Sequence, residues 1–282
     1  MTIDFHVHFF PDAIAPRAMA SMTEKLGGRA FPVGDGTAAG LLAAMDAAGV
    51  DIGVLCPVAT RPGQFDTLLR VSLAIRDGAL GPALARRIVP LAGIHPADPS
   101  AEARLRAIAD AGLKGVKLHP YYQGFTLDDP SLHRFFCAVR DCGLAVQCHC
   151  GADLGFVDEP EARCSPKRIW NLLKAVPGLR FCAAHAGGWS EDKEGFFDRL
   201  AFDTDCRADT AVLEQDVQKP AARRAVRAWP AEKLLFGTDF PWAPYAPVMD
   251  MVRELRAPGE LEGVFGANAA AFLGIDVPEA TD

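Results

Sequence analysis

Two histidines, His6 and His8, stand one residue apart in the apolar run 3–9. Because side chains alternate between the two faces of a β-strand, this spacing predicts both imidazoles on one face. Neutral imidazole is a common ligand of zinc and similar divalent ions, and two copies held on a rigid strand lose little entropy on coordination. The pair could also be polar residues of a half-buried strand, so the other histidines are needed to decide between the two interpretations.

Four further polar residues end apolar runs later in the chain: His119, His149, His185 and Asp239. We expect His149 to be a third metal ligand, because Gly151 lets a ligand or a loop approach closely. Small residues surround His185, which could be a fourth nitrogen ligand or a nearby acid or base. Asp239 could bind the metal or accept a proton from a metal-held water. Its structural alternative is to cap the following helix.

Lys117 shares strand parity with His119, so both side chains are predicted to face the interior of the protein. A buried lysine is costly unless it is paired or modified. Lys117 could pair with Asp203 or Asp205, hydrogen-bond to a substrate carboxylate, or bridge two metals if carbamylated. His119 is expected to be a substrate-facing donor.

Other candidate substrate-binding residues follow the apolar runs. Arg61 could hold a substrate carboxylate through its guanidinium. Aromatic residues would suit a planar substrate, although they could equally be ordinary packing residues. The aromatic candidates are Phe9, Phe10, Tyr121, Tyr122, Trp189 and Trp242.

The elements that must position these residues alternate between β-rich and amphipathic segments. The predicted strands are Thr2–Phe10, Ile52–Pro57, Ile88–Ile94, Gly115–Leu118, Ala145–His149, Arg180–His185, Leu200–Thr204 and Leu234–Gly237. The predicted helices between them include 37–48, 65–77, 100–111, 131–142, 165–175 and 221–229. Eight such repeats predict an α/β fold, a distorted (β/α)₈ TIM barrel. A doubly wound open sheet gives a similar alternation, but the spread of polar residues over many strand ends favours the barrel.

Composition limits the class of protein. The 282 residues are 50% hydrophobic, which fits one domain over 1–282 with a lid-like excursion at about 10–36. A net charge of -7 without a basic cluster predicts no nucleic-acid or membrane partner. No signal peptide or membrane span is evident, and the eight cysteines are interpreted as reduced core residues of a cytoplasmic protein. The thiols of Cys148 and Cys150 should face away from His149. The expected partner is a small-molecule substrate, and formation of a homodimer is left open.

Taken in order, these motifs resemble the amidohydrolase superfamily, nearest to the amidohydrolase-2 group that includes aminocarboxymuconate-semialdehyde decarboxylase. The motifs are His6-Val-His8, Lys117-Leu-His119-Pro, the cysteine-flanked His149, His185-Ala-Gly-Gly, Gly-Thr-Asp239-Phe-Pro-Trp242 and the late Asn268-Ala-Ala-Ala-Phe-Leu. The resemblance extends over about residues 3–273. It implies one divalent ion, usually Zn²⁺ with Mn²⁺ as an alternative, held by the residues matching His6, His8, His149 and Asp239. It also implies that His185 lies beside the metal.

Three functions follow from these observations. The first is a metal-dependent hydrolase that uses an activated water on a small lactone, amide or ester, with His185 and Asp239 as catalytic residues. The alternative is a metal-dependent nonoxidative decarboxylase of a small unsaturated or aromatic carboxylic acid. The chain is shorter than typical decarboxylases of this group, which places hydrolysis first. The third is a noncatalytic barrel that retains a metal.

Overall fold

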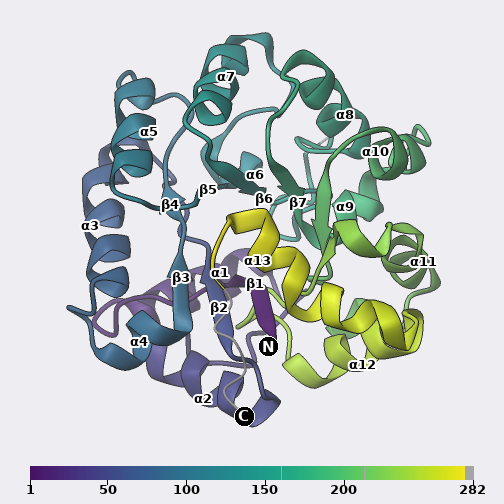
Figure 1. Cartoon of the computed structure of the whole chain (residues 1–282), viewed down its shortest axis with the longest axis horizontal. Helices are drawn as coiled ribbons and strands as arrows, with labels where there is room; N and C mark the ends of the chain where they lie inside the picture. The colour runs from purple at the N-terminus through teal and green to yellow at the C-terminus, as the bar shows by residue number, and fades with distance from the viewer. Residues whose placement is uncertain (160, 213, 277–282) are drawn as a thin grey trace.

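The strands follow one another around a ring in this computed structural model, which describes residues 1–159, 161–212 and 214–276 (Figure 1). All the pairings are parallel. One sheet has the order β1 (Ile3–Val7), β2 (Ile52–Leu55), β3 (Ile88–Pro90). The other has the order β4 (Ala92–Gly93), β5 (Gly115–Leu118), β6 (Ala145–Cys148), β7 (Phe181–Ala183), β8 (Arg207–Asp209), β9 (Leu234–Leu235).

Backbone hydrogen bonds join the two sheets at both of their edges. Only Leu91 separates β3 from β4, and its N–H donates to the Leu55 carbonyl at 3.0 Å, so β3 and β4 act as one strand. At the other junction, the Phe5 N–H donates to the Phe236 carbonyl at 2.8 Å. Val7 and Phe240 form a parallel bridge just beyond. The strands therefore close into the predicted barrel.

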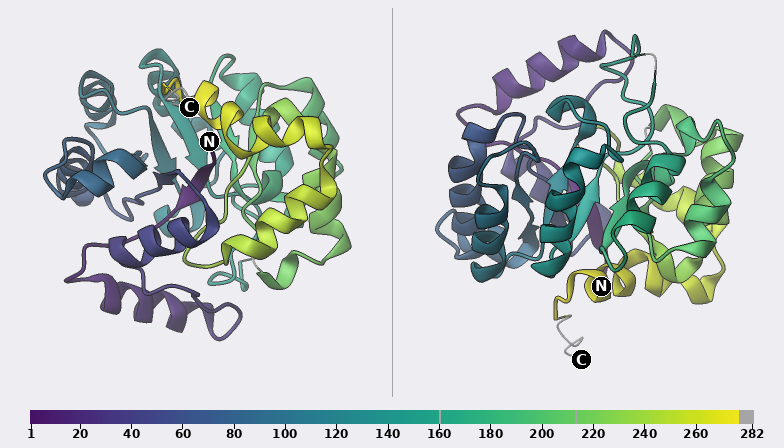
Figure 2. Two further views of the ribbon diagram at one scale, coloured as in Figure 1. Left: turned by 60° about the horizontal axis from the view of Figure 1, so that its bottom comes forward. Right: turned by 90° about the horizontal axis from the view of Figure 1, so that it is seen from above.

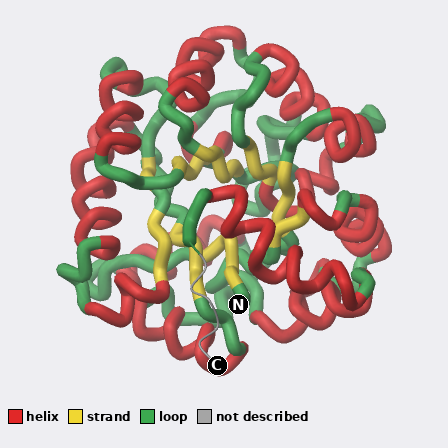
Figure 3. The backbone as a smooth tube through the Cα atoms, viewed as in Figure 1, coloured by secondary structure: helices red, strands yellow, loops and turns green. Residues whose placement is uncertain are grey.

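Helices surround the strands, as Figure 3 shows. Their apolar faces pack on the outside of the ring, where Val116, Leu118 and Val146 point between the sheet and the helices. The surrounding helices are α2 (Ala38–Ala48), α3 (Phe65–Arg76), α4 (Pro82–Arg87), α5 (Ala101–Asp110), α7 (His133–Asp141), α8 (Pro166–Ala175), α10 (Phe197–Asp203), α11 (Pro220–Ala228) and α12 (Tyr245–Leu255). In the described part of the chain, no helix is long and apolar enough to cross a bilayer.

The two ends of the barrel differ. At the end where the strands begin, α13 (Asn268–Leu273) packs over β1, and the rings of Phe5 and Phe272 lie 5.7 Å apart. At the end where the strands finish, short segments leave the ring: α6 (Pro120–Gln123) and α9 (Ala184–Gly188). The carboxyl ends of barrel strands are where active sites form.

The segment predicted as an excursion contains helix α1 (Ala15–Leu26). Figure 2 shows α1 on the side of the barrel opposite the N-terminus, outside the ring of helices. The Lys25 ammonium near the end of α1 lies 3.6 Å from the Phe156 ring centroid and 4.4 Å from that of Tyr122. This cation–π contact fixes α1 against loops at the carboxyl ends of the strands.

One predicted strand is wrong. Residues 200–204 belong to helix α10, and the seventh strand of the ring is β8, Arg207–Asp209. Leu200 and Ala201 are buried while Asp198, Arg199, Phe202 and Asp203 are exposed, a helical rather than an alternating pattern. Because the strand was misplaced, Asp209, at the carboxyl end of β8, was not predicted as a site residue.

Candidate metal centre and active site

His6 is held in a defined tautomer at the centre of the site. Its side chain is 1% exposed, and its Nδ1 lies 3.0 Å from Asp209 Oδ2. Because a carboxylate oxygen can only accept, Nδ1 carries the proton and Nε2 keeps its lone pair. Burial, together with the positive charge of Lys117, lowers the pKa of His6 well below its usual value. His6 is therefore neutral and offers Nε2 as a ligand atom.

His8 and Asp239 complete a group of three potential ligands with His6, whose ligand atoms all lie within 4.8 Å of one another. Asp239 Oδ1 is 3.1 Å from His8 Nε2 and 3.3 Å from His6 Nε2. Burial would raise the pKa of Asp239, but the nearby His6 and His8 bring it below its ordinary value, so the carboxylate is ionised. Two imidazoles and one carboxylate form a donor set suited to a divalent ion.

Backbone strain marks two residues of this site. His185 and Asp239 have φ values of 58° and 63°, in the left-handed region that non-glycine residues rarely occupy. The Asp239 N–H donates to the His6 carbonyl at 2.8 Å, so the strained turn is tied to β1. Strain of this kind is maintained where the surrounding structure fixes it, often at functional sites.

His149 and His185 form a second imidazole pair beside this group. His185 Nδ1 donates to the Ala211 carbonyl at 2.8 Å, which leaves its Nε2 as the acceptor for His149 Nδ1–H, also at 2.8 Å. Because Nδ1 of His149 carries the proton, His149 Nε2 keeps a lone pair. It is buried and has no hydrogen-bond partner in the described part of the chain. The His185 ring lies 5.4 Å from the His6 ring, centroid to centroid.

His149 also belongs to a second potential ligand group, with His119 and Asp153. The His119 and His149 rings stack at 4.0 Å, and their Nε2 atoms lie 3.4 Å and 3.8 Å from Asp153 Oδ2. Burial lowers the pKa of both histidines and raises that of Asp153. The His149 ring thus contacts both His119 and His185, and the His185 ring in turn lies beside that of His6.

These residues fit a bound divalent ion. Burial keeps His6 and His149 neutral, and the Nε2 atom of His149 is buried without a hydrogen-bond partner in the described residues. An unpaired buried donor or acceptor costs free energy that a ligand can recover. The ion would be held by His6, His8 and Asp239, with His149 as the expected further ligand.

Lys117 is fully buried inside the ring but not in the predicted ion pair. Its Nζ lies 2.8 Å from His6 Nε2, whereas Asp203 and Asp205 are both exposed. The pairing with these two aspartates was wrong because they were assigned near a strand end that is in fact part of α10. Lys117 therefore contributes positive charge directly to the metal group.

Of the other predicted substrate-binding residues, His119 and Trp242 lie at the site, whereas Arg61 has no contact in the described part of the chain that places it there. His119 lies inside the site, with the Tyr122 ring at 4.6 Å. Trp242 is half-buried in the turn after Asp239, and its backbone N–H donates to the Asp239 carbonyl at 2.8 Å. Arg61 is exposed before the short turn Pro62–Gln64, and no contact in the described residues brings it to the histidines.

Asp209 is a site residue that the sequence did not reveal. Its buried carboxylate accepts from His6 Nδ1, from Gln147 Nε2 at 2.7 Å, and from the His185 N–H at 2.8 Å. Burial raises the pKa of Asp209, while these donors favour the ionised form. Asp209 thus orients a predicted ligand and the backbone of a predicted catalytic residue together.

We expect Asp209→Asn to weaken metal binding about 10- to 100-fold, because the His6 tautomer and its orientation depend on the charged acceptor. Isothermal titration of metal-free protein with Zn²⁺ or Mn²⁺ measures the effect. Asp205→Asn, which changes an exposed carboxylate nearby, is the matched control. Equal affinities of the two variants would contradict the role given to Asp209.

Asp4, near the start of β1, supports the site through hydrogen bonds to two backbone segments. Its fully buried carboxyl accepts from the backbone N–H groups of His6 and Thr238 at 2.9 Å and 3.0 Å. Its second oxygen lies 2.5 Å from Thr238 Oγ1. Burial raises the pKa of Asp4 to about 7. The group therefore ties the first strand to the turn that carries Asp239.

This pKa predicts a pH-dependent stability. Because the folded protein binds the Asp4 proton more tightly than the unfolded chain, its contribution is present at pH 4 and is lost as the pH rises through about 7. Asn mimics the protonated carboxyl, so Asp4→Asn should lack this loss. Urea unfolding at pH 5 and pH 8 should show wild type losing at least about 1 kcal/mol relative to Asp4→Asn. Parallel pH profiles would refute the prediction, and the exposed Asp12→Asn serves as control.

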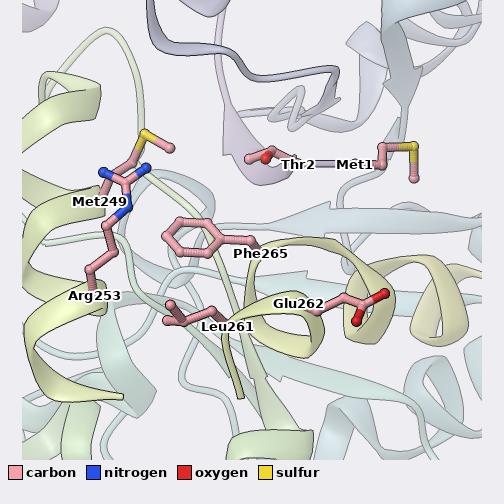
Figure 4. A pocket seen from close by; sticks show the side chains of 7 residues that line it. All are labelled: Met1, Thr2, Met249, Arg253, Leu261, Glu262 and Phe265. Carbon is pink, nitrogen blue, oxygen red and sulfur yellow. The ribbon is translucent and has the colours of Figure 1, made fainter. Parts of the chain in front are cut away.

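A surface hollow of about 410 Å³ lies away from these residues (Figure 4). It is lined by Met1, Thr2, Met249, Arg253, Leu261, Glu262 and Phe265. Met1 and Thr2 precede β1, so the hollow is near the end of the barrel where strands begin. It contains none of the histidines and no part of the metal group.

Comparisons with known proteins agree with the resemblance seen in the sequence. Residues 3–275 match the family model described as Amidohydrolase. A curated relative, 2-amino-3-carboxymuconate-6-semialdehyde decarboxylase from Dictyostelium discoideum, is 24% identical over 213 residues. That match covers 61% of this chain and 56% of the relative, so little more than half of the relative's length is represented.

Solved structures share the fold at low identity. A TIM-barrel protein from Bordetella bronchiseptica has a TM-score of 0.72 and 18% identity, covering 97% of this chain and 98% of its own. A manganese complex of 5-carboxyvanillate decarboxylase from Novosphingobium aromaticivorans has a TM-score of 0.68 and 14% identity, with coverage of 98% and 96%. A probable 2-pyrone-4,6-dicarboxylic acid hydrolase from Acinetobacter baumannii has a TM-score of 0.67 and 16% identity, with coverage of 97% and 99%.

Proposed function

Because this chain is an enzyme of the amidohydrolase family, we propose that it is a metal-dependent nonoxidative decarboxylase of a small unsaturated or aromatic carboxylic acid. The observation that carries the proposal is the compact His6, His8 and Asp239 group beside the His149–His185 pair. The site combines metal ligands with His185, whose imidazole is not needed as a ligand. The His185 imidazole is therefore available to transfer a proton.

The relatives favour this activity over the hydrolysis that the sequence placed first. The curated relative is a decarboxylase, and decarboxylases of 5-carboxyvanillate and 2,6-dihydroxybenzoate recur among the similar structures. The structural match extends over 96% of one such decarboxylase chain, so the length difference leaves little of it unmatched. The length of the chain therefore does not favour hydrolysis, although a hydrolase is also among the similar structures.

The ion would be held by His6, His8, Asp239 and His149. Bound there, a divalent ion supplies Lewis acidity toward a substrate oxygen. Zn²⁺ fits the nitrogen-rich donor set, and Mn²⁺ is supported by the decarboxylase relative that holds it. Lys117 adds a buried positive charge that would attract an anionic acid into the ring.

The residues around the ion would bind and protonate the substrate. Tyr122 and His119 offer flat surfaces for a planar acid, and Trp242 stands at the turn after Asp239. In the reaction, the bond between the substrate carbon and its carboxylate breaks, the electron pair stays on that carbon, and carbon dioxide leaves. His185 Nε2, which accepts from His149 Nδ1–H, would take up a proton from solvent and pass it to that carbon to form the new C–H bond, while the Ala211 carbonyl holds Nδ1–H.

Carbon dioxide release tests the proposal. Metal-free protein should be inactive toward hydroxybenzoic and carboxymuconate-type acids, and added Zn²⁺ or Mn²⁺ should restore carbon dioxide release detected by a coupled assay. A parallel panel of lactones, amides and esters should show no comparable turnover. Restored hydrolysis of the panel without carbon dioxide release would return the enzyme to the hydrolase class.

Two other expectations stay predictions of the sequence. A homodimer and a cytoplasmic location fit the proposed activity. The reaction as written uses residues of one chain and requires neither.

A further inference from the structure

Three thiols gather behind β6, on the side of the strand away from His149. Cys148, Cys150 and Cys164 are each at most 1% exposed, and their Sγ atoms all lie within 4.8 Å of one another. They lie in the apolar core between the sheet and the helices. The predicted orientation of Cys148 and Cys150 is thus confirmed, and all eight cysteines are free thiols. The proposed decarboxylation uses none of these three.

Two of the thiols are in direct contact. The Cys164 S–H donates to Cys150 Sγ at 3.1 Å. The chain segments that carry them are also joined, because the Gly151 N–H donates to the Cys164 carbonyl at 2.7 Å. The third thiol, Cys148, donates to the His149 carbonyl at 3.4 Å, and its Sγ lies within 4.8 Å of the other two sulfurs. Cys150 and Cys164 therefore need only a small movement to bond.

The surroundings favour a disulfide over a thiolate-bound metal. Two neutral thiols become a neutral disulfide, which leaves no charge in the apolar core. A metal held by three thiolates would place several charges there, and the potential ligand group of the described residues contains only the three sulfurs. From this contact and its apolar setting, we propose that Cys150 and Cys164 form a reversible disulfide when the protein meets a peroxide.

The reaction balances with hydrogen peroxide as the oxidant. One thiol is first oxidised to a sulfenic acid with release of one water. The second sulfur attacks it, the S–S bond forms, and a second water leaves. The O–O bond of the peroxide is broken and its oxygens are reduced, while both sulfurs are oxidised. A dithiol reductant reverses the change by thiol–disulfide exchange.

The cross-link would close a loop next to the metal centre. Cys150 and Cys164 are 14 residues apart, and the segment between them carries Asp153, which faces His119 and His149. Closing a loop of this length restricts the unfolded chain, so the oxidised protein should melt roughly 5 °C or more above the reduced form. The disulfide thus links the oxidation state of the core to the stability of a loop at the site.

Mass spectrometry of the whole chain tests the cross-link. Brief treatment with hydrogen peroxide should lower the intact mass by about 2 Da for one disulfide. Peptide mapping without reduction should recover Cys150 joined to Cys164, and dithiothreitol should reverse both the mass change and the rise in melting temperature. This result is independent of the reaction that the enzyme catalyses.

Three variants sharpen the test. Cys164→Ala should lose the cross-link and the thermal shift, whereas Cys148→Ala and the half-buried Cys137→Ala should keep both. The proposal is overturned by a bond that maps to another pair, by oxidation of these thiols to sulfinic acid without a disulfide, or by their unchanged mass. Stoichiometric zinc that protects all three thiols from the peroxide would also overturn it. If Cys164→Ala does not fold, the peptide map of wild type decides alone.

Discussion

Asp239→Asn should abolish carbon dioxide release, with a loss of at least about 10³-fold in kcat/KM, because the site loses its one ionised ligand oxygen. Asn tolerates the left-handed backbone at φ 63° almost as well as Asp, so the turn should survive. The same variant should bind much less Zn²⁺ or Mn²⁺. Measuring kcat/KM together with metal content by elemental analysis therefore tests whether the loss of activity comes from loss of the metal ligand.

The matched control for this change is Asp141→Asn, an exposed carboxylate at the end of α7. It should leave both readouts unchanged. Full metal content in Asp239→Asn together with wild-type turnover would remove Asp239 from the metal centre.

His185→Asn should lower kcat about 10²- to 10⁴-fold while metal content stays near that of wild type, since His185 is assigned to proton transfer rather than to binding the ion. Asn again accepts the positive φ of 58° and cannot deliver the proton. Steady-state kinetics should show the effect mainly in kcat, and product formed by wild type in D₂O should carry deuterium at the former carboxyl carbon. His133→Asn, an exposed histidine of α7, is the control.

Loss of the metal along with activity in His185→Asn would instead make His185 a ligand. In that case His149, whose Nδ1 lies 2.8 Å from His185 Nε2, would become the candidate for proton transfer. The two roles are distinguishable because only a ligand controls metal content.

The sequence correctly predicted side-chain directions where the two-residue alternation of a β-strand determines them. The alternation of β1 placed His6 and His8 on one face, and both side chains reach Asp239. The end of the last strand correctly identified the position of Asp239, since the apolar run before it and the turn after it are both local signals. The barrel itself followed from repeated strand and helix segments, and the family match supports it.

The sequence failed where the signal is short or nonlocal. β8 has three residues, too few for a clear alternation of buried and exposed side chains. The strand was therefore predicted at residues 200–204, which belong to the adjacent helix α10. Asp209 was missed for this reason. Asp153 lies in a loop, and only folding brings its carboxylate to His119 and His149. Asp4 has the same parity as His6, but its partner Thr238 is more than two hundred residues away.

The central claim is that one divalent cation binds where His6, His8 and Asp239 converge. The most direct measurement is a crystal structure of the metal-loaded protein, with anomalous scattering recorded at the absorption edge of zinc or manganese. We predict a single strong peak at roughly 2.0–2.3 Å from His6 Nε2, His8 Nε2 and an Asp239 oxygen. No peak at this position in protein that releases carbon dioxide, or a peak confined to His119 and Asp153, would contradict the claim.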